Sequence, residues 1–276
     1  MEDPITRAQE LLEKGNAEEA IKLLEGINSP EAYYIRYLAK RVLKIKNAED
    51  ELIEGIRKFP YNHYLHYELA KCYEEQGKLN NALVEIDKSL ELLPISTDYK
   101  ELKAKILYEL ENFENALILV NDILRLKPAD YEARLIKIMC YYNQGLRMDS
   151  LAEINRALNY FSKDPFLHYL KGKIYLESNF YKLALSEFKI ALSFEKKPEY
   201  FYYASLASFL INQYNEALFY VNEGIKLSGN LEYKALKARI LWAMGKREEA
   251  RQLALEITRL SKELTSEVSD IVNMNE

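Results

Sequence analysis

The sequence predicts an all-α fold, an α-solenoid of about eight helix-turn-helix repeats closed by a C-terminal capping helix. The first observation is a small residue that recurs 28 residues after its first occurrence and then every 33 or 34 residues. The second is that each recurrence lies within a pair of amphipathic helical patterns joined by a short turn. The third is the lack of a Gly/Ser-rich or Pro-rich linker, so we expect one elongated domain over residues 1–276. The recurring residue is Ala20, Ala48, Ala82, Ala116, Ser150, Ala184, Ala217 and Ala250.

Residues 63–94 show the repeat most clearly. Leu69, Ala70 and Tyr73 fall on one face of a first helix, and Gly77 begins the turn to a second helix that Pro94 ends. The small residues at the crossing let the two helices approach closely. Such a hairpin leaves an apolar flank that it cannot bury alone, so it needs neighbours of the same kind.

Other positions repeat with the same register. A small residue lies twelve positions before the anchor, at Ala8, Ala70, Ala104, Gly172, Ser205 and Ala238. An aromatic residue or Leu lies nine before it, at Leu11, Tyr73, Leu107, Tyr141, Tyr175 and Leu241, and a proline closes several repeats, at Pro60, Pro94 and Pro128. This pattern resembles the tetratricopeptide repeat (TPR) family over nearly the whole chain. The resemblance implies a right-handed superhelix that binds other proteins.

Taken in order, the chain divides into units with one hairpin each. The expected ranges are 1–29, 30–62, 63–96, 97–130, 131–164, 165–197, 198–230 and 231–263, followed by a capping segment over 264–276. Helix starts are predicted at Asp3, Ser29, Ser96, Asp130 and Asp164, with Asn47 as a cap inside the second hairpin. The first unit is about six residues short, and the second and seventh depart from the family pattern at Arg36, Ala39 and Ser208.

The first helix of the seventh unit is apolar on nearly every side, in the run YFYYASLASFLI that begins at Tyr200. We expect it either to be unusually buried or to face a partner.

Composition excludes several classes of function. The net charge of −5, without a basic patch, argues against nucleic acid as the main partner. We expect no membrane span and a cytoplasmic protein, with Cys72 and Cys140 as reduced core thiols. The sequence carries no motif of a phosphate loop, metalloprotease or hydrolase, so we expect no enzyme, no cofactor and no metal site. His63 and His66 lack a third ligand, and packing explains His66 and His168 better than metal binding does.

The first helices of the repeats are expected to line one continuous groove with side chains fifteen, eleven and eight positions before each anchor. Much of the surplus of 22 tyrosines falls there. Tyr rings offer apolar area and a hydroxyl at low entropy cost, which suits peptide binding. The predicted groove residues are Tyr33, Tyr37, Tyr67, Lys71, Lys105, Tyr108, Met139, Tyr142, Tyr169, Lys173, Tyr202, Phe209, Arg239 and Trp242.

A structural explanation stands beside the functional one. The Tyr rings can simply fill the inner side of a tight superhelix. Lys71, Lys105 and Lys173 can pair with Glu75, Glu109 and Glu177 one helical turn further on.

The resulting hypothesis is an adaptor or assembly scaffold that binds a protein or peptide partner, including one with an acidic segment facing the lysines. The Lys, Asn and Arg set with which some TPR proteins grip a chaperone's C-terminal carboxylate does not occur here. The alternative is a self-assembling scaffold that associates through its end repeats or seventh unit, and a third hypothesis is RNA binding.

Overall fold

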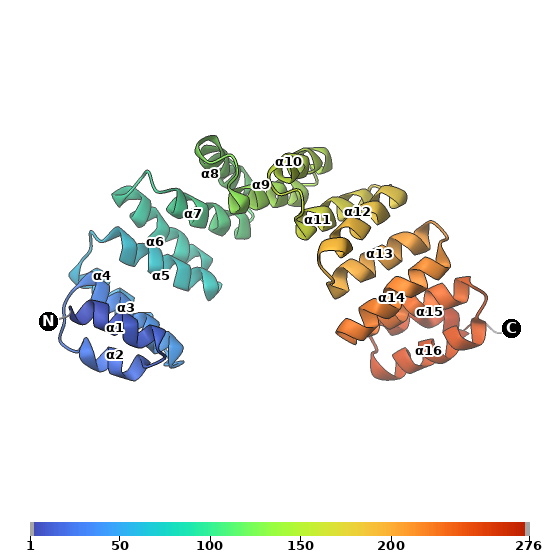
Figure 1. Cartoon of the computed structure of the whole chain (residues 1–276), viewed down its shortest axis with the longest axis horizontal. Coiled ribbons are helices and arrows are strands. Elements are labelled where there is room, and N and C mark those ends of the chain that lie inside the picture. Colours follow the sequence, from blue (N-terminus) through green and yellow to red (C-terminus); the bar gives the residue numbers. More distant parts are fainter. Residues whose placement is uncertain (1–2, 274–276) are drawn as a thin grey trace. The chain divides into compact units, whose positions relative to one another are not determined.

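The computed structural model describes residues 3–273, which contain seventeen helices and no strand. The helices fall into two compact units, one ending at Gly145 and the other beginning at Leu146. Figure 1 shows consecutive helices paired as hairpins within each unit. The first unit contains α1 (Pro4–Glu13), α2 (Ala17–Leu23), α3 (Pro30–Val42), α4 (Asp50–Lys58), α5 (His63–Glu75), α6 (Leu79–Leu92), α7 (Thr97–Glu109), α8 (Phe113–Leu126) and α9 (Tyr131–Asn143). The second contains α10 (Arg147–Tyr160), α11 (Pro165–Glu177), α12 (Tyr181–Phe194), α13 (Pro198–Leu210), α14 (Tyr214–Ser228), α15 (Leu231–Ala243), α16 (Arg247–Leu260) and α17 (Thr265–Asn273).

The all-α helix-pair architecture agrees with the sequence. Each of the eight expected ranges holds two helices, and α17 follows them. The ends of the first and last expected ranges, residues 1–2 and 274–276, lie outside the described residues. The unit boundary falls between α9 and α10, inside the range 131–164.

Polar caps start most of the first helices. The side chains of Ser29, Ser96, Asp130 and Asp164 each accept a hydrogen bond from the backbone N–H three residues on, as does Asn62 at the start of α5. Asp3 precedes Pro4 as expected but makes no such bond. Asn47 is not a cap, because α4 begins at Asp50; it takes a left-handed conformation instead, with φ of 56°.

The recurring small residues lie where helices cross. All eight anchors are buried, and seven of them have no exposed surface. Gly172 shows how tight the crossing is, because a Cβ built there would lie 2.5 Å from Cε1 of Phe188 in the paired helix. The repeat register is therefore set by close helix contact.

Two histidines link the helices of their own hairpins. His66 Nδ1 lies 2.6 Å from Glu85 of α6, and its Nε2 lies 3.0 Å from the Pro60 carbonyl oxygen. His168 repeats the arrangement with Glu187 and the Ser162 carbonyl oxygen. Each buried imidazole thus connects the second helix of its hairpin to the segment that precedes the first helix.

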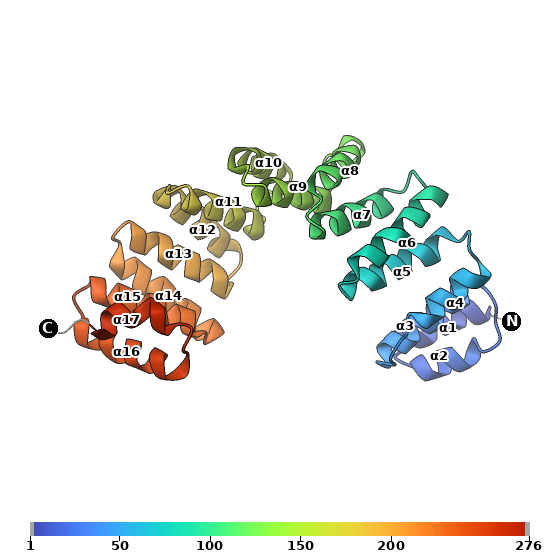
Figure 2. The ribbon, with the colours of Figure 1, turned by 180° about the vertical axis from the view of Figure 1, so that it is seen from behind.

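The C-terminal end of the second unit is covered as expected. Helix α17 packs against α15 and α16, and Val268 and Ile271 are buried beneath it (Figure 2). The apolar first helix of the seventh unit, α13, is largely internal, and it contacts α11, α12, α14 and α15. Its unusual composition is thus explained by burial.

Candidate functional site

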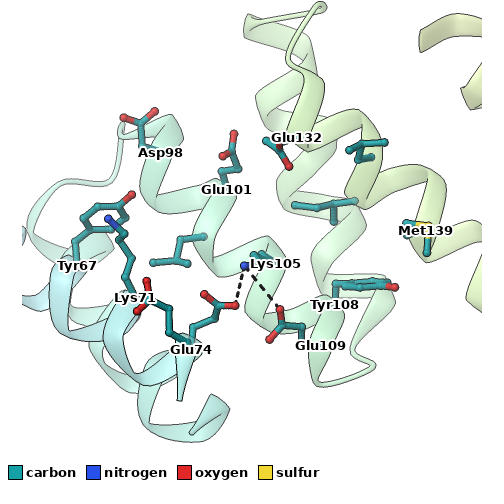
Figure 3. A pocket seen from close by; sticks show the side chains of 14 residues that line it. Tyr67, Lys71, Glu74, Asp98, Glu101, Lys105, Tyr108, Glu109, Glu132 and Met139 are labelled. Carbon is teal, nitrogen blue, oxygen red and sulfur yellow. Dashed lines mark ion pairs between the residues drawn. The ribbon is translucent and has the colours of Figure 1, made fainter. Parts of the chain in front are cut away.

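Three neighbouring first helices of the first unit, α5, α7 and α9, enclose a groove. Helix α7 packs against both α5 and α9, so the side chains that these helices present on one side converge (Figure 3). The groove encloses about 450 Å³. Its lining is Tyr67, Lys71, Glu74, Glu75, Asp98, Glu101, Leu102, Lys105, Tyr108, Glu109, Glu132, Leu135, Ile136 and Met139.

One part of the lining is apolar and aromatic. Leu135 and Met139 of α9 are half-buried, and so are the rings of Tyr67 and Tyr108. Tyr67 is held by stacking on buried Tyr99, with ring centroids 4.5 Å apart. This surface can bury apolar groups of a ligand without a large rearrangement of the helices.

The two groove lysines are both engaged by carboxylates. Lys105 lies 2.7 Å from Glu74 of α5 and 4.0 Å from Glu109 (dashed lines in Figure 3). Lys71 lies 3.4 Å from Glu68 and 5.3 Å from the centroid of the Tyr67 ring. Burial acts to lower the pKa of Lys105, but the bond to Glu74 and the nearby carboxylates outweigh it, so that its pKa is raised. Both lysines thus have their charge balanced inside the groove.

These ion pairs match the expected Lys–Glu pairs only in part. Lys105 does approach Glu109 four residues on, but its shorter contact crosses to Glu74. Lys71 pairs with Glu68, while Glu75 pairs with Arg41 of α3 at 2.8 Å. In the second unit, Lys173 lies over the rings of Tyr169 and Tyr203.

The groove is rich in carboxyl groups, with six carboxyl side chains against two lysines in its lining. Burial, followed by the charge of Asp130, a hydrogen bond shared with its side chain, and the charges of Glu132 and Asp98, raises the pKa of Glu101 from 4.5 to about 7. Burial and the carboxylate of Glu74 also raise the pKa of Glu109. Burial is the largest cause of both shifts, and the neighbouring carboxylates add to it.

Five of the fourteen predicted groove residues come together here: Tyr67, Lys71, Lys105, Tyr108 and Met139. Tyr142 lies on α9 and is half-buried. In the second unit, Tyr202, Phe209 and Trp242 are half-buried and Arg239 is exposed. Arg239 Nε donates to the Glu267 carbonyl oxygen of α17, and the Arg247 guanidinium lies over the Trp242 ring.

Three predicted groove tyrosines lie in the interior instead. Tyr33, Tyr37 and Tyr169 expose 6%, 1% and 3% of their surface. The Tyr33 hydroxyl donates to Asn28 Oδ1, and the Tyr37 hydroxyl accepts from Arg41. Tyr169 is enclosed by aromatic rings and its hydroxyl donates to Glu199; burial raises its pKa well above the usual range of a tyrosine. Their rings mainly fill space between helices.

The predicted groove residues did not include its carboxylates, although Glu101 and Glu74 lie fifteen and eight positions before their anchors, on the predicted face. Asp98 and Glu132 lie eighteen positions before their anchors, and Glu75 and Glu109 lie seven before theirs. Position eighteen lies about one helical turn before position fifteen, and position seven lies about one turn after position eleven, so both border the predicted face, which is the signal that would have found them.

The described part of the chain contains neither a metal-binding group of side chains nor a membrane-spanning helix. Within residues 3–273, no group of three or more His, Cys, Asp or Glu side chains is arranged to hold a metal ion. His63 and His66 have separate partners, Tyr99 and Glu85. Every helix over the same residues is too short or too polar to cross a membrane.

No family model matches the sequence, and no curated protein matches it either. Solved structures do resemble the fold. A TPR protein from Parabacteroides merdae has a TM-score of 0.65 at 16% identity, over 86% of this chain and 97% of its own. Pseudomonas aeruginosa pilF has a TM-score of 0.62 at 17% identity, over 78% and 95%. YrrB, described as a TPR protein with an unusual peptide-binding site, has a TM-score of 0.51 at 16% identity, over 66% and 94%. The chain therefore has the tetratricopeptide repeat fold.

Proposed function

We propose that the protein is a non-catalytic interaction module that binds an extended segment of a partner protein in the groove between α5, α7 and α9. The observation that carries this proposal is the convergence of apolar, aromatic and charged side chains from three successive first helices on one cavity of about 450 Å³. Peptide binding by YrrB, a protein of the same fold, supports it.

The dimensions of the groove suit a peptide. First helices that pack in sequence lie roughly 10 Å apart, so three of them span about 20 Å. An extended chain advances about 3.3 Å per residue, so six to eight residues cross the groove. Alternate side chains of such a segment can enter it while the others face solvent.

Site-specific photo-crosslinking tests this proposal without a known ligand. A photoreactive phenylalanine analogue replaces Met139, which lines the groove, in the protein expressed in its native cells. The control places the same analogue at Ile118 of α8, which is 61% exposed and lies outside the groove lining. We expect a discrete crosslinked partner from position 139 that is missing from position 118.

Mass spectrometry of that species identifies the partner and the crosslinked segment. The proposal fails if position 139 yields no crosslink beyond background, or if both positions capture the same set of proteins. The assay is repeated with Leu135→Arg, which fills the groove with a charged side chain and should abolish the crosslink.

Self-association is the alternative function, and exposed apolar side chains on outer helices of the second unit favour it. Leu183 of α12 and Phe219 of α14 expose 51% and 57% of their surface. Sedimentation velocity over a wide concentration range separates the two, because a constant monomer mass contradicts self-association.

A further inference from the structure

We infer that the groove between α5, α7 and α9 selects a partner segment that carries Lys or Arg side chains. This inference rests on the proposed peptide-binding function and names the chemistry of the ligand. It reverses the expectation of an acidic segment that the lysine positions suggested.

The lysines of the groove do not offer free positive charge. Lys105 already contacts Glu74 and Glu109, and Lys71 contacts Glu68 and the face of Tyr67. An acidic ligand would have to displace these intramolecular partners and then leave their carboxylates unbalanced. The lysines therefore shape the charge inside the groove but do not attract an anionic peptide.

The carboxylates lie where a cation can reach several of them. Glu101 of α7 and Glu132 of α9 extend toward each other from adjacent helices, and Asp98 lies on the same side (Figure 3). Asp130 adds a further carboxylate close to Glu101. A guanidinium or ammonium group placed between Glu101 and Glu132 would meet both carboxylates at once, whereas Asp98 already lies 4.0 Å from Lys127.

The apolar lining accommodates the rest of a basic side chain. Leu135 lies one turn along α9 from Glu132, and Leu102 follows Glu101 on α7. The methylene stem of Lys or Arg can lie on these side chains while the charged end reaches Glu101 and Glu132.

The test compares two pools of fluorescein-labelled peptides, each about eight residues long so that it spans the groove. The pools share the same apolar and small residues and differ only at alternate positions, which hold Lys or Arg in one pool and Asp or Glu in the other. Anisotropy is measured with the full chain at an ionic strength of about 0.15 M, where distant charges are screened. We expect the basic pool to bind and the acidic pool to remain free.

Matched variants locate the interaction. Glu101→Gln combined with Glu132→Gln should weaken binding of the basic pool about fivefold, because both carboxylates that face the cation lose their charge. The control combines Glu91→Gln and Glu114→Gln, which change net charge equally at exposed positions on α6 and α8. The control should bind like the wild type.

Equal affinity for both pools, or equal weakening by the control variant, overturns the inference. Peptide binding to the Leu135→Arg variant shows whether only the charge selection fails or the proposed peptide-binding function fails as well. If both pools bind alike and Leu135→Arg abolishes both, the groove binds peptides without charge selection. If no peptide binding depends on Leu135, the groove is not the peptide site and both proposals fail.

Discussion

Replacement of Tyr169 tests whether the tyrosine surplus belongs to the groove or to the interior. Tyr169 exposes 3% of its surface, and its ring lies 5.0 Å from that of Tyr200, 5.5 Å from Tyr203 and 6.2 Å from Phe188, measured between centroids. Tyr169→Ala removes a buried aromatic ring and leaves a cavity, so we expect a loss of about 3–5 kcal/mol in the free energy of unfolding.

The Tyr169 hydroxyl contributes to the free energy of unfolding separately from the ring. It donates to Glu199 of α13, whose carboxylate is on an exposed residue and can be rehydrated. Tyr169→Phe therefore should cost only about 0.5–1.5 kcal/mol. Tyr200→Phe is the matched control, because the buried Tyr200 hydroxyl makes no hydrogen bond of ordinary geometry within residues 3–273. That substitution should change stability less than Tyr169→Phe does.

Urea unfolding followed by tryptophan fluorescence measures these losses. Trp242 is the one tryptophan of the chain and lies on α15 of the second unit, the same unit as Tyr169. A shift of the Tyr169→Ala midpoint that corresponds to less than about 1 kcal/mol would refute the interior role of this ring. Tyr67→Ala serves as the comparison in the first unit, where circular dichroism should show a smaller loss because that ring is half-buried.

Two further predictions concern the crossing of α11 with α12 and the charge of the groove. Gly172→Ala forces a Cβ against buried Phe188 and should destabilise by about 1–2 kcal/mol after the gain in helix propensity; adding Phe188→Leu should recover part of this loss in urea unfolding. The raised pKa of Glu101 means that the folded chain retains a proton that the unfolded chain loses, so wild-type stability should fall as pH rises from 4.5 to about 7. In the Glu101→Gln variant, the difference between the urea midpoints at pH 5 and pH 7.5 should be smaller than in the wild type. An equal difference in both proteins would contradict the role of Glu101 in this pH dependence.

The repeat register could be predicted from sequence because it depends on local contacts. All eight hairpins have a small residue near the start of the second helix and six have one on the first helix as well, so this contact recurs at nearly fixed spacing along the sequence. The buried anchors from Ala20 to Ala250 follow from this rule. Asn47 shows its limit, because the short α4 starts later than the pattern indicates, and Asn47 forms the turn instead of the cap.

The side chains of the groove could not be assigned from repeat position alone. Tyr67 and Tyr169 occupy equivalent positions, yet one is half-buried in the groove and the other is interior. Each ring packs on a tyrosine of the next repeat, Tyr99 or Tyr200, but Tyr169 is also covered by Tyr203, whose equivalent beside Tyr67 is Leu102. Burial of a repeat side chain depends on the size of its neighbour's side chains, which the periodicity does not specify.

The ion-pair partners of the groove residues also could not be predicted from the sequence. The expected partner of Lys71 was Glu75, but Glu75 pairs with Arg41 from the preceding hairpin. Cross-helix partners compete with partners one turn away, and only the packing of the helices decides between them.

The position of Glu101 distinguishes a ligand site from an ordinary acidic surface. Asp98 and Glu132 lie in the first turns of α7 and α9, where a negative charge stabilises the helix start by interaction with the helix dipole. Glu101 lies beyond that turn, and its raised pKa shows that its charge is unfavourable in the folded chain. A residue that opposes folding but would bind a cation fits a functional trade-off between stability and binding. Glu101→Gln should therefore stabilise the fold near neutral pH and weaken the basic peptide, a combination that a purely structural residue would not show.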